Sequence, residues 1–319
     1  MLYPISVPKR DSPEDLIGYI DRSGRIIVSP VYDAGSWFSE GLASICGEGG
    51  LSGFIDEAGE IRIPFQFQGL GLFHEGLCPI GRGTLVGYIN RRGDWEIEPR
   101  FLIAGRYSEG IAAFSPNGSD LGYIDRSGAT LVEPRYEQAG IFRNGLGAVC
   151  REGKWGYIDR RGAVVIPFQF EGPRAQTFTN GLAGVRIGGR WGVIDHGGNW
   201  VVMPQYEDIR RFSEGFAPVC INGKWGVIDA GGRTRVVPRF DDLDEFEEGI
   251  ACASLDGRAG FVSLDGAWVI EPQYERCHRF VGDLAMGQAG NVYHYVSRSG
   301  EIVWSSAEYA MPQAPPFLE

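Results

Sequence analysis

Residues 153–162 read Gly-Lys-Trp-Gly-Tyr-Ile-Asp-Arg-Arg-Gly. The Gly-Tyr-Ile within this stretch predicts a short strand, and the Asp-x-x-Gly that follows predicts a hairpin turn. Aspartate at the start of a type I turn caps backbone N–H groups, and the last glycine supplies the positive φ that closes the hairpin. Apolar residues two and four places after the turn glycine, as at Trp268 and Ile270, predict a second, half-buried strand. We expect this strand to end at a proline such as Pro272, because proline cannot donate to a ladder.

The pattern recurs along the whole chain at a nearly fixed period. The glycine that opens the first strand returns at Gly18, Gly53, Gly87, Gly122, Gly156, Gly192, Gly226 and Gly260. Another period leads to His294, where the glycine is lost but the rest of the pattern continues. A period of about 20–50 residues is the signature of solenoids, propellers and related arrays.

Two aromatic positions repeat together with the hairpin. The first aromatic position, eight places after the turn glycine, is occupied by Tyr32, Phe67, Phe101, Tyr136, Phe170, Tyr206, Phe240 and Tyr274. The second, just before the third strand of a unit, is occupied by Phe38, Phe73, Tyr107, Phe142, Phe178, Phe212, Phe246 and Phe280. One unit cannot bury such side chains alone, whereas stacked neighbours can. We therefore expect these aromatic residues to form the core.

The motif resembles the WG repeat, also called the KWG repeat, of bacterial proteins. It stands complete in residues 153–159 and 223–229, and residues 189–195 differ only by Arg190 in place of the lysine. Six units hold another residue in the tryptophan position: Ile17, Ser52, Val86, Leu121, Ala259 and Tyr293. The resemblance covers nearly the whole chain and implies a repeat protein, without catalytic residues that could be carried over.

The expected fold is all-β, an array of nine three-stranded repeats of roughly 34 residues. Residues 1–310 are expected to form this single array, and residues 311–319 a proline-rich C-terminal tail. The segment from Leu2 to Val7 would feed the strand at Gly18, and Val303-Trp304 would close the last unit, so that no strand is exchanged between the ends. Propellers typically have four to eight blades of four strands. Nine three-stranded units therefore favour an open or spiralling array, with a closed propeller-like ring as the alternative.

Composition excludes several classes of partner. The net charge is −11 and no basic stripe offsets it, so we expect no nucleic-acid partner. No apolar run reaches the roughly 18 residues of a membrane span, and the N-terminus lacks the pattern of a secretory signal. We therefore expect a cytoplasmic protein without a membrane partner. The six cysteines form no CxxC pair, which predicts no zinc site and reduced thiols rather than disulfides.

Residues that carry chemistry mostly occupy repeat positions. Most of the aspartates at the hairpins are expected to serve the turns, and the four histidines fall in different units and positions. Cys46, Cys150 and Cys220 share one position, which predicts small buried side chains rather than nucleophiles. The repeated tryptophans are expected in the core rather than in a sugar-binding row. The sequence thus predicts no catalytic residue, no metal site and no cofactor.

The loops after the first aromatic position escape the repeat, and such variable loops are where repeat proteins usually bind. One of them carries six acids among eight residues and is the candidate docking patch for a basic partner: Asp241, Asp242, Asp244, Glu245, Glu247 and Glu248. Two other loops contribute candidate contacts through Trp37, Arg210 and Arg211.

The expected function is a non-catalytic protein-binding scaffold. Its most concrete version is an immunity or antitoxin-like protein that binds and occludes a partner such as a toxin, by analogy with other repeat proteins. Two alternatives remain open, a saccharide-active hydrolase or lyase with a cleft site, and a carbohydrate- or ligand-binding module. Convergent carboxylates or histidines would favour the enzyme, and a row of exposed tryptophans would favour the sugar binder.

Overall fold

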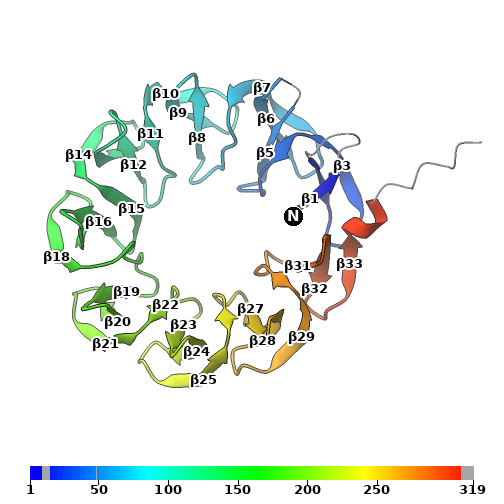
Figure 1. Ribbon diagram of the computed structural model, residues 1–319. Helices are drawn as coiled ribbons and strands as arrows, with labels where there is room; N and C mark the ends of the chain where they lie inside the picture. Colours follow the sequence, from blue (N-terminus) through cyan, green and yellow to red (C-terminus); the bar gives the residue numbers. More distant parts are fainter. Residues whose placement is uncertain (9–14, 48, 310–319) are drawn as a thin grey trace, which may run out of the picture.

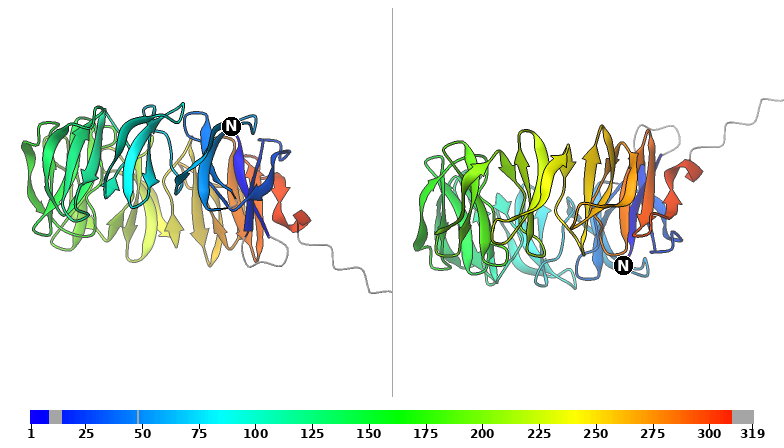
Figure 2. Two further views of the ribbon diagram at one scale, coloured as in Figure 1. Left: turned by 90° about the horizontal axis from the view of Figure 1, so that it is seen from above. Right: turned by 90° about the horizontal axis from the view of Figure 1, so that it is seen from below.

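The computed structural model describes residues 1–8, 15–47 and 49–309. They form small antiparallel sheets arranged around a central axis like the blades of a propeller (Figure 1). Seen from the side, the molecule is a flat disc (Figure 2). The predicted all-β array is confirmed: its nine units form nine blades, and the Gln68–Gly81 pairing joins the second and third blades into one seven-stranded sheet. The tail predicted at residues 311–319 lies outside the described residues.

Blades 1 to 5 follow one another in chain order. Their strands are β1 (Tyr3–Pro8), β2 (Asp15–Ile20) and β3 (Ile26–Tyr32) in blade 1; β4 (Ala34–Gly35), β5 (Leu42–Cys46), β6 (Leu51–Asp56) and β7 (Ile61–Gln68) in blade 2; β8 (Leu77–Arg82), β9 (Leu85–Asn90) and β10 (Trp95–Phe101) in blade 3; β11 (Ile103–Ala104), β12 (Ile111–Ser115), β13 (Leu121–Asp125) and β14 (Thr130–Tyr136) in blade 4; and β15 (Gln138–Arg143), β16 (Leu146–Arg151), β17 (Lys154–Ile158) and β18 (Val164–Phe170) in blade 5.

Blades 6 to 9 complete the ring. Their strands are β19 (Leu182–Ile187), β20 (Arg190–Asp195) and β21 (Trp200–Tyr206) in blade 6; β22 (Asp208–Ile209), β23 (Phe216–Ile221), β24 (Lys224–Asp229) and β25 (Thr234–Phe240) in blade 7; β26 (Asp242–Leu243), β27 (Ile250–Leu255), β28 (Arg258–Ser263) and β29 (Trp268–Tyr274) in blade 8; and β30 (Arg276–Cys277), β31 (Leu284–Ala289), β32 (Val292–Ser297) and β33 (Ile302–Ser305) in blade 9, followed by the short 3-10 helix η1 (Ser306–Tyr309).

Within a blade the strands run outward from the axis in chain order. The three strands predicted for each unit are present, and six blades add a fourth, inner strand that the sequence did not predict: β4, β11, β15, β22, β26 and β30. In blade 7, β22 lies nearest the centre and β25 on the outside (Figure 1). The inner strand comes from the variable loop after the first aromatic position. This loop therefore crosses from each blade to the inner edge of the next one.

The outer strand does not end at its proline, contrary to our prediction. In blade 7, β25 continues through Pro238 to Phe240, and its pairing with β24 shifts between Trp225 and Val227. Proline is tolerated in such a bulge because the bulged residue need not donate to the ladder. The bulge brings the outer strand close to Gly226, where a Cβ atom would lie 2.6 Å from the Pro238 nitrogen. The glycine of the repeat is therefore required by close backbone approach.

The hydrophobic cores lie between neighbouring blades. One core joins Trp155, Tyr157 and Phe170 of blade 5 to Phe178 and Ile194 of blade 6. Both repeating aromatic positions are buried, as predicted, except at the first residue of each series, where Tyr32 and Phe38 are half-buried. Each blade thus shields a face of the next.

Polar contacts tie consecutive blades at the Glu-Gly or Asn-Gly turns that lie just before strands such as β8, β12 and β16. Glu75 has a φ of 54°, and its carboxylate accepts a hydrogen bond from the Gly110 N–H of the next blade at 2.8 Å. Arg126 donates to the Glu75 carbonyl oxygen at 2.7 Å. Glu40, Glu109 and Glu214 each make the same carboxylate contact with a glycine about one period later. These glutamates therefore have a structural role, because each one ties its loop to the next blade.

The two ends of the array meet. Among the described residues no ladder joins β1 to blade 9, so the hydrogen-bonded array is open and exchanges no strand, as expected. Blade 1 nevertheless packs against blade 9 in one core that includes Tyr3, Ile5, Tyr295 and Trp304, which gives the ring arrangement kept as the alternative (Figure 1). The Tyr295 hydroxyl donates to the Pro4 carbonyl oxygen at 2.7 Å.

Candidate functional site

The inner segments of blades 6 to 9 carry polar or charged residues at three equivalent positions. In chain order these are Arg174, Gln176 and Thr177; Asp208, Arg210 and Arg211; Asp242, Asp244 and Glu245; and Arg276, His278 and Arg279. Because consecutive blades stand side by side, a residue in one segment faces its equivalents about one period later. We call this series of side chains the inner-rim ladder.

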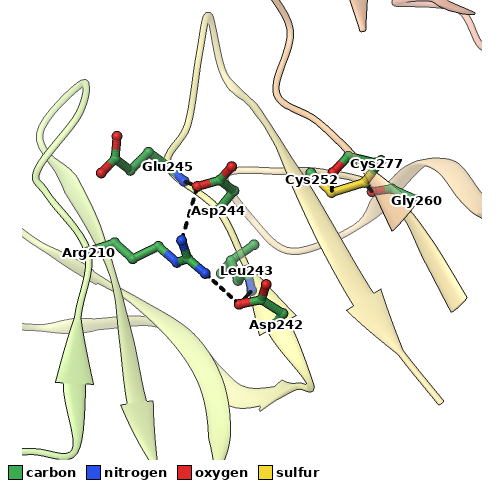
Figure 3. Close-up of a disulfide and its surroundings, with 8 residues drawn as sticks. All are labelled: Arg210, Asp242, Leu243, Asp244, Glu245, Cys252, Gly260 and Cys277. Atoms are coloured by element: carbon green, nitrogen blue, oxygen red, sulfur yellow. Dashed lines mark hydrogen bonds and ion pairs between the residues drawn. A yellow bond between two sulfur atoms is a disulfide. The ribbon is translucent and has the colours of Figure 1, made fainter. Parts of the chain in front are cut away.

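Arg210 of the inner-rim ladder faces two acids of the next blade, Asp242 and Asp244 (Figure 3). Its guanidinium contacts the Asp242 carboxylate at 2.7 Å and the Asp244 carboxylate at 3.4 Å. It also covers the Trp225 ring at 4.9 Å from the ring centre. In the preceding blade, Arg174 pairs in the same way with Asp208 at 3.2 Å and covers Trp191. Each arginine thus links two inner segments and shields a repeat tryptophan.

Arg211 pairs with Glu245 on the same side of the ring. Its side chain donates to both carboxylate oxygens, at 3.0 and 2.8 Å. Burial alone would raise the pKa of Glu245, but the hydrogen bond and charge of Arg211 outweigh it and lower that pKa. The hydrogen bond from Lys224 likewise lowers the pKa of Asp241. These carboxyl groups are held ionised by their partners.

The acidic loop predicted as a docking patch is therefore largely neutralised within the chain. Besides the four acids paired above, Glu248 contacts Arg298 at 2.7 Å. Glu247 is exposed and makes no ion pair within the described part of the chain. The structure thus joins the predicted acids to the predicted Arg210 and Arg211, although the sequence analysis assigned them to separate loops.

Three cavities connect the inner-rim ladder to Trp37, the last of the residues predicted to contact a partner. One of about 390 Å³ is lined by Arg174, Arg210, Arg211 and Glu245, and one of about 350 Å³ is lined by Arg210, Asp242, Asp244, Arg276 and His278.

The third cavity measures about 490 Å³, shares Arg276 and His278 with the second, and is lined by Trp37. Trp37 is 39% exposed and packs edge-on against Tyr3 at 6.5 Å between ring centres. Because each cavity shares a residue with the next, we describe them together as the inner-rim groove, which runs from blade 6 across the ring closure.

Sequence reasoning missed Arg276 and His278, the residues that join the second and third cavities. Aligning the units would have found them. Blade 9 holds three basic side chains at the positions where blade 8 holds three acids. No ion pair or side-chain hydrogen bond of Arg276 or His278 occurs within residues 1–8, 15–47 and 49–309.

The prediction of reduced cysteines is wrong for one pair. Cys252 of β27 and Cys277 of β30 form a disulfide, with Cα atoms 6.0 Å apart (Figure 3). Cys252 lies in the second strand of blade 8 and Cys277 in the inner strand of blade 9, a neighbourhood that the sequence separation of 25 residues does not reveal. Of the three cysteines predicted to be small buried side chains, Cys150 and Cys220 are buried, whereas Cys46 is only half-buried. Burial raises the pKa of Cys150 and of Cys220. A raised pKa disfavours the thiolate that nucleophilic chemistry needs.

The repeated tryptophans do not form an exposed row. Trp155 and Trp191 are buried, the indole N–H of Trp155 donates to the Gly172 carbonyl oxygen at 3.1 Å, and Trp225 lies under Arg210. The described residues contain no group of three or more His, Cys, Asp or Glu that could hold a metal ion. Within the same residues no helix is long and apolar enough to cross a membrane.

Comparison with protein families matches one model, described as WG containing repeat. The matched segments are residues 17–50, 53–81, 87–118, 122–155, 155–191, 191–225, 225–258 and 260–293. A comparison with curated proteins gives no match.

Solved structures resemble the chain at low sequence identity. A structure described as the eukaryotic initiation factor has a TM-score of 0.66 at 10% identity, over 96% of this chain and 96% of its own. BamB from Moraxella catarrhalis has a TM-score of 0.46 at 16% identity, over 74% of this chain and 86% of its own. Dihydro-heme d1 dehydrogenase NirN has a TM-score of 0.48 at 11% identity, over 95% of this chain and 72% of its own. The first likeness shows a shared overall fold.

Proposed function

Because the chain belongs to the WG-repeat family, we propose that it is a non-catalytic scaffold that binds another protein along the inner-rim groove. One observation carries this proposal. Residues from the variable loops of at least four blades line three consecutive cavities, of which the first two share Arg210 and the last two share Arg276 and His278. A long groove built from many loops fits an extended protein surface better than it fits a small substrate.

The charge state of the groove supports binding rather than acid catalysis. A general acid at neutral pH needs a carboxyl whose pKa is raised. The pKa values of Asp241 and Glu245 are instead lowered by Lys224 and Arg211. The paired carboxylates hold neighbouring blades in a fixed geometry, which is what a preorganised binding surface requires.

The more specific version of the proposal is an immunity or antitoxin-like protein that occludes a partner such as a toxin. A ring that presents a groove across several blades has the area to cover a partner's own site. The partner's activity is the readout: it should be blocked by the wild-type chain and restored by groove variants that no longer bind.

We also propose a cytoplasmic location, and the Cys252–Cys277 pair provides its test. Disulfides are rare in reducing compartments, so the bond that the structure forms between these two cysteines should be largely reduced to thiols in a cytoplasmic chain. Rapid alkylation in intact cells, followed by mass spectrometry, measures the state of the pair. A fully oxidised pair would place the chain in an oxidising compartment and leave the scaffold proposal intact.

The scaffold proposal is tested by capture with the full chain and matched surface variants. Trp37→Ser removes an exposed apolar side chain from the groove, and Val237→Ser removes a 71% exposed one from the outer strand β25. We expect a captured partner to be lost from the Trp37→Ser chain, retained by the Val237→Ser chain, and cross-linked to groove residues. Capture that depends on Val237 and not on Trp37 would overturn the proposal.

A further inference from the structure

The ring closure lacks one element that neighbouring blades have. In blades 2, 4, 5, 7, 8 and 9 an inner strand pairs with the next strand outward, as β26 pairs with β27. Blade 1 has three strands in the order β1-β2-β3, and no described residue pairs with the inner edge of β1. The groove passes this edge, because the cavity at the closure is lined by Pro4 and Ser6.

The repeat specifies which backbone groups this edge offers. In blade 8 the N–H groups of Asp241 and Asp244 donate to the carbonyl oxygens of Ser254 and Cys252, each at 2.8 Å. Tyr3 pairs with Ile20 as Ala251 pairs with Val262. This register makes Ser6 the equivalent of Ser254, and Pro4 the equivalent of Cys252. An added strand would therefore donate to the Ser6 and Pro4 carbonyl oxygens.

The Pro4 carbonyl oxygen already has a substitute donor. In blade 2 the hydroxyl of Tyr19 donates to Ser36 of the inner segment, and the Ser36 N–H donates to the Ser44 carbonyl oxygen. At the closure no inner segment lies in the described structure, and the Tyr295 hydroxyl donates directly to Pro4. An incoming strand would take the Pro4 carbonyl oxygen and return Tyr295 to the contact that Tyr19 makes.

Charge defines what kind of strand fits. Along the inner-rim ladder, basic side chains of one blade meet acids of the next: Arg174 meets Asp208, and Arg210 meets Asp242 and Asp244. Arg276 and His278 of blade 9 are exposed and face the strandless edge of blade 1 across the same cavity. Among the described residues that line this cavity the acid is Asp15, whose carboxylate accepts a hydrogen bond from the Ser6 hydroxyl at 2.5 Å. The site therefore calls for carboxylates on the missing strand.

The cavity walls define the residue between those carboxylates. They include the aromatic rings of Trp37, Tyr293, Tyr295 and Trp304. In blade 8 the corresponding residue is Leu243, which is fully buried between Asp242 and Asp244. The repeat thus predicts the order acid, apolar residue, acid. Residues 310–313, which follow the last described residue, read Ala-Met-Pro-Gln and contain no acid.

We propose that the partner adds an acidic extended segment as the missing inner strand of blade 1, antiparallel to β1, with its carboxylates on Arg276 and His278. This inference rests on the scaffold function proposed above and names the chemistry of the partner. Main-chain hydrogen bonds to a sheet edge supply affinity in such strand addition, and the alternate side chains supply specificity. The attraction to Arg276 and His278 should weaken as salt rises.

The chain supplies its own probe for this site. A labelled peptide with the sequence of residues 240–246, Phe-Asp-Asp-Leu-Asp-Glu-Phe, copies the inner segment of blade 8. We expect fluorescence anisotropy to show binding to the full chain, and about tenfold weaker binding to the Arg276→Glu, His278→Glu double variant. Arg235→Glu, on the outer strand β25, should leave the affinity unchanged. A peptide with Asn and Gln in place of the acids should bind about as weakly as the double variant does.

Backbone methylation of the peptide separates strand addition from simple charge attraction. N-methylation at the position equivalent to Asp244 removes an N–H that the ladder uses, whereas N-methylation at the Leu243 position removes one that bonds only the Asp242 side chain. We expect the first to weaken binding at least about tenfold and the second to change it little. Equal effects, or no binding by the full chain, would overturn the inference.

Two further outcomes separate the possible occupants and the two proposals. Binding by a chain that ends at residue 309, but not by the full chain, would mean that residues 310–319 fill the site and that no partner strand does. A partner that cross-links to the groove but is not displaced by the peptide would contradict the strand-addition inference and would still support the scaffold function. Thermal unfolding of each variant must match the wild type, so that lost binding is not lost folding.

Discussion

The junction that closes the ring, between blades 9 and 1, makes the same aromatic contacts as a junction between consecutive blades. It makes them without a covalent link and without an inner strand. Inside the array, Tyr123 packs edge-on against Phe142, and its hydroxyl bonds the Gly140 carbonyl oxygen. At the closure, Tyr295 packs against Tyr3 and bonds the Pro4 carbonyl oxygen. The covalent link and the inner strand are missing there, but the aromatic pair and the tyrosine hydrogen bond are reproduced. Closure therefore depends on side-chain packing and on hydrogen bonds made by tyrosine hydroxyls.

Blade 9 also differs from the others in its outer strand. Its β33 pairs His294 with Ser305 and Tyr295 with Trp304 without the bulge that faces the repeat glycine elsewhere. Because no bulged backbone presses on this position, a side chain fits where every other unit needs glycine. The loss of the motif glycine in the last unit thus has a local cause in the geometry of its partner strand.

The largest effect should come from filling the glycine position inside the array. In Gly226→Ala, the new Cβ would overlap the Val236 carbonyl oxygen and press on Pro238, and both are backbone atoms that cannot turn away. We expect a loss of about 2–3 kcal/mol in the free energy of unfolding. His294→Ala, at the same position of blade 9, should cost less than about 1 kcal/mol. Urea titration measures both, and equal costs would contradict our account of the ninth unit.

The second test compares two turn glycines with the same backbone geometry. Gly24 and Gly215 both have a φ of 84°, so alanine at either should cost about 1 kcal/mol in backbone strain. At Gly24 the added Cβ would also overlap the Val303 carbonyl oxygen of blade 9, whereas at Gly215 it meets nothing within 4 Å. We expect Gly24→Ala to lower the melting temperature clearly more than Gly215→Ala does. The same melting temperature for both variants would mean that the ring is open in solution.

A smaller effect should come from single hydroxyl groups. Tyr295→Phe removes the hydrogen bond across the closure, and Tyr123→Phe removes its equivalent between blades 4 and 5. Each should lower the free energy of unfolding by about 1 kcal/mol, the usual net contribution of such a bond. Differential scanning calorimetry measures both effects. If Tyr123→Phe lowers the free energy of unfolding and Tyr295→Phe does not, the closing contact is not formed.

Much of the fold follows from the sequence because each unit repeats the same local chemistry. The turn aspartates, the glycines and the two aromatic positions predict the hairpins and the core. The inner strands escaped prediction because most of them are two residues long, and their pairing depends on where the next blade stands. The Arg210–Asp242 pair and the disulfide escaped for the same reason, since each joins different blades. A sequence read unit by unit shows which residues repeat, but the facing pairs appear only when units are aligned one period apart.

The smallest expected effect is a change in the pH dependence of stability. It compares the half-buried His294 of blade 9 with the exposed His278 of the inner-rim ladder. Burial lowers the pKa of His294 below the usual value near 6.5, because its imidazole is half-buried beside Tyr274 and its Nδ1 atom finds no hydrogen-bond partner among the described residues. In the folded chain the ring resists protonation, so the unfolded chain binds more protons between the two pKa values. The stability contributed by neutral His294 is therefore complete above about pH 6.5 and is lost as pH falls toward the folded pKa.

We expect the melting temperature to drop by about 1–2 °C less between pH 7.5 and pH 5.5 in His294→Gln than in the wild type. His278→Gln, at an exposed imidazole on the inner rim, is the matched control and should follow the wild-type curve. If both substitutions shift the curve equally, burial at the ninth blade is not the cause of the pH dependence.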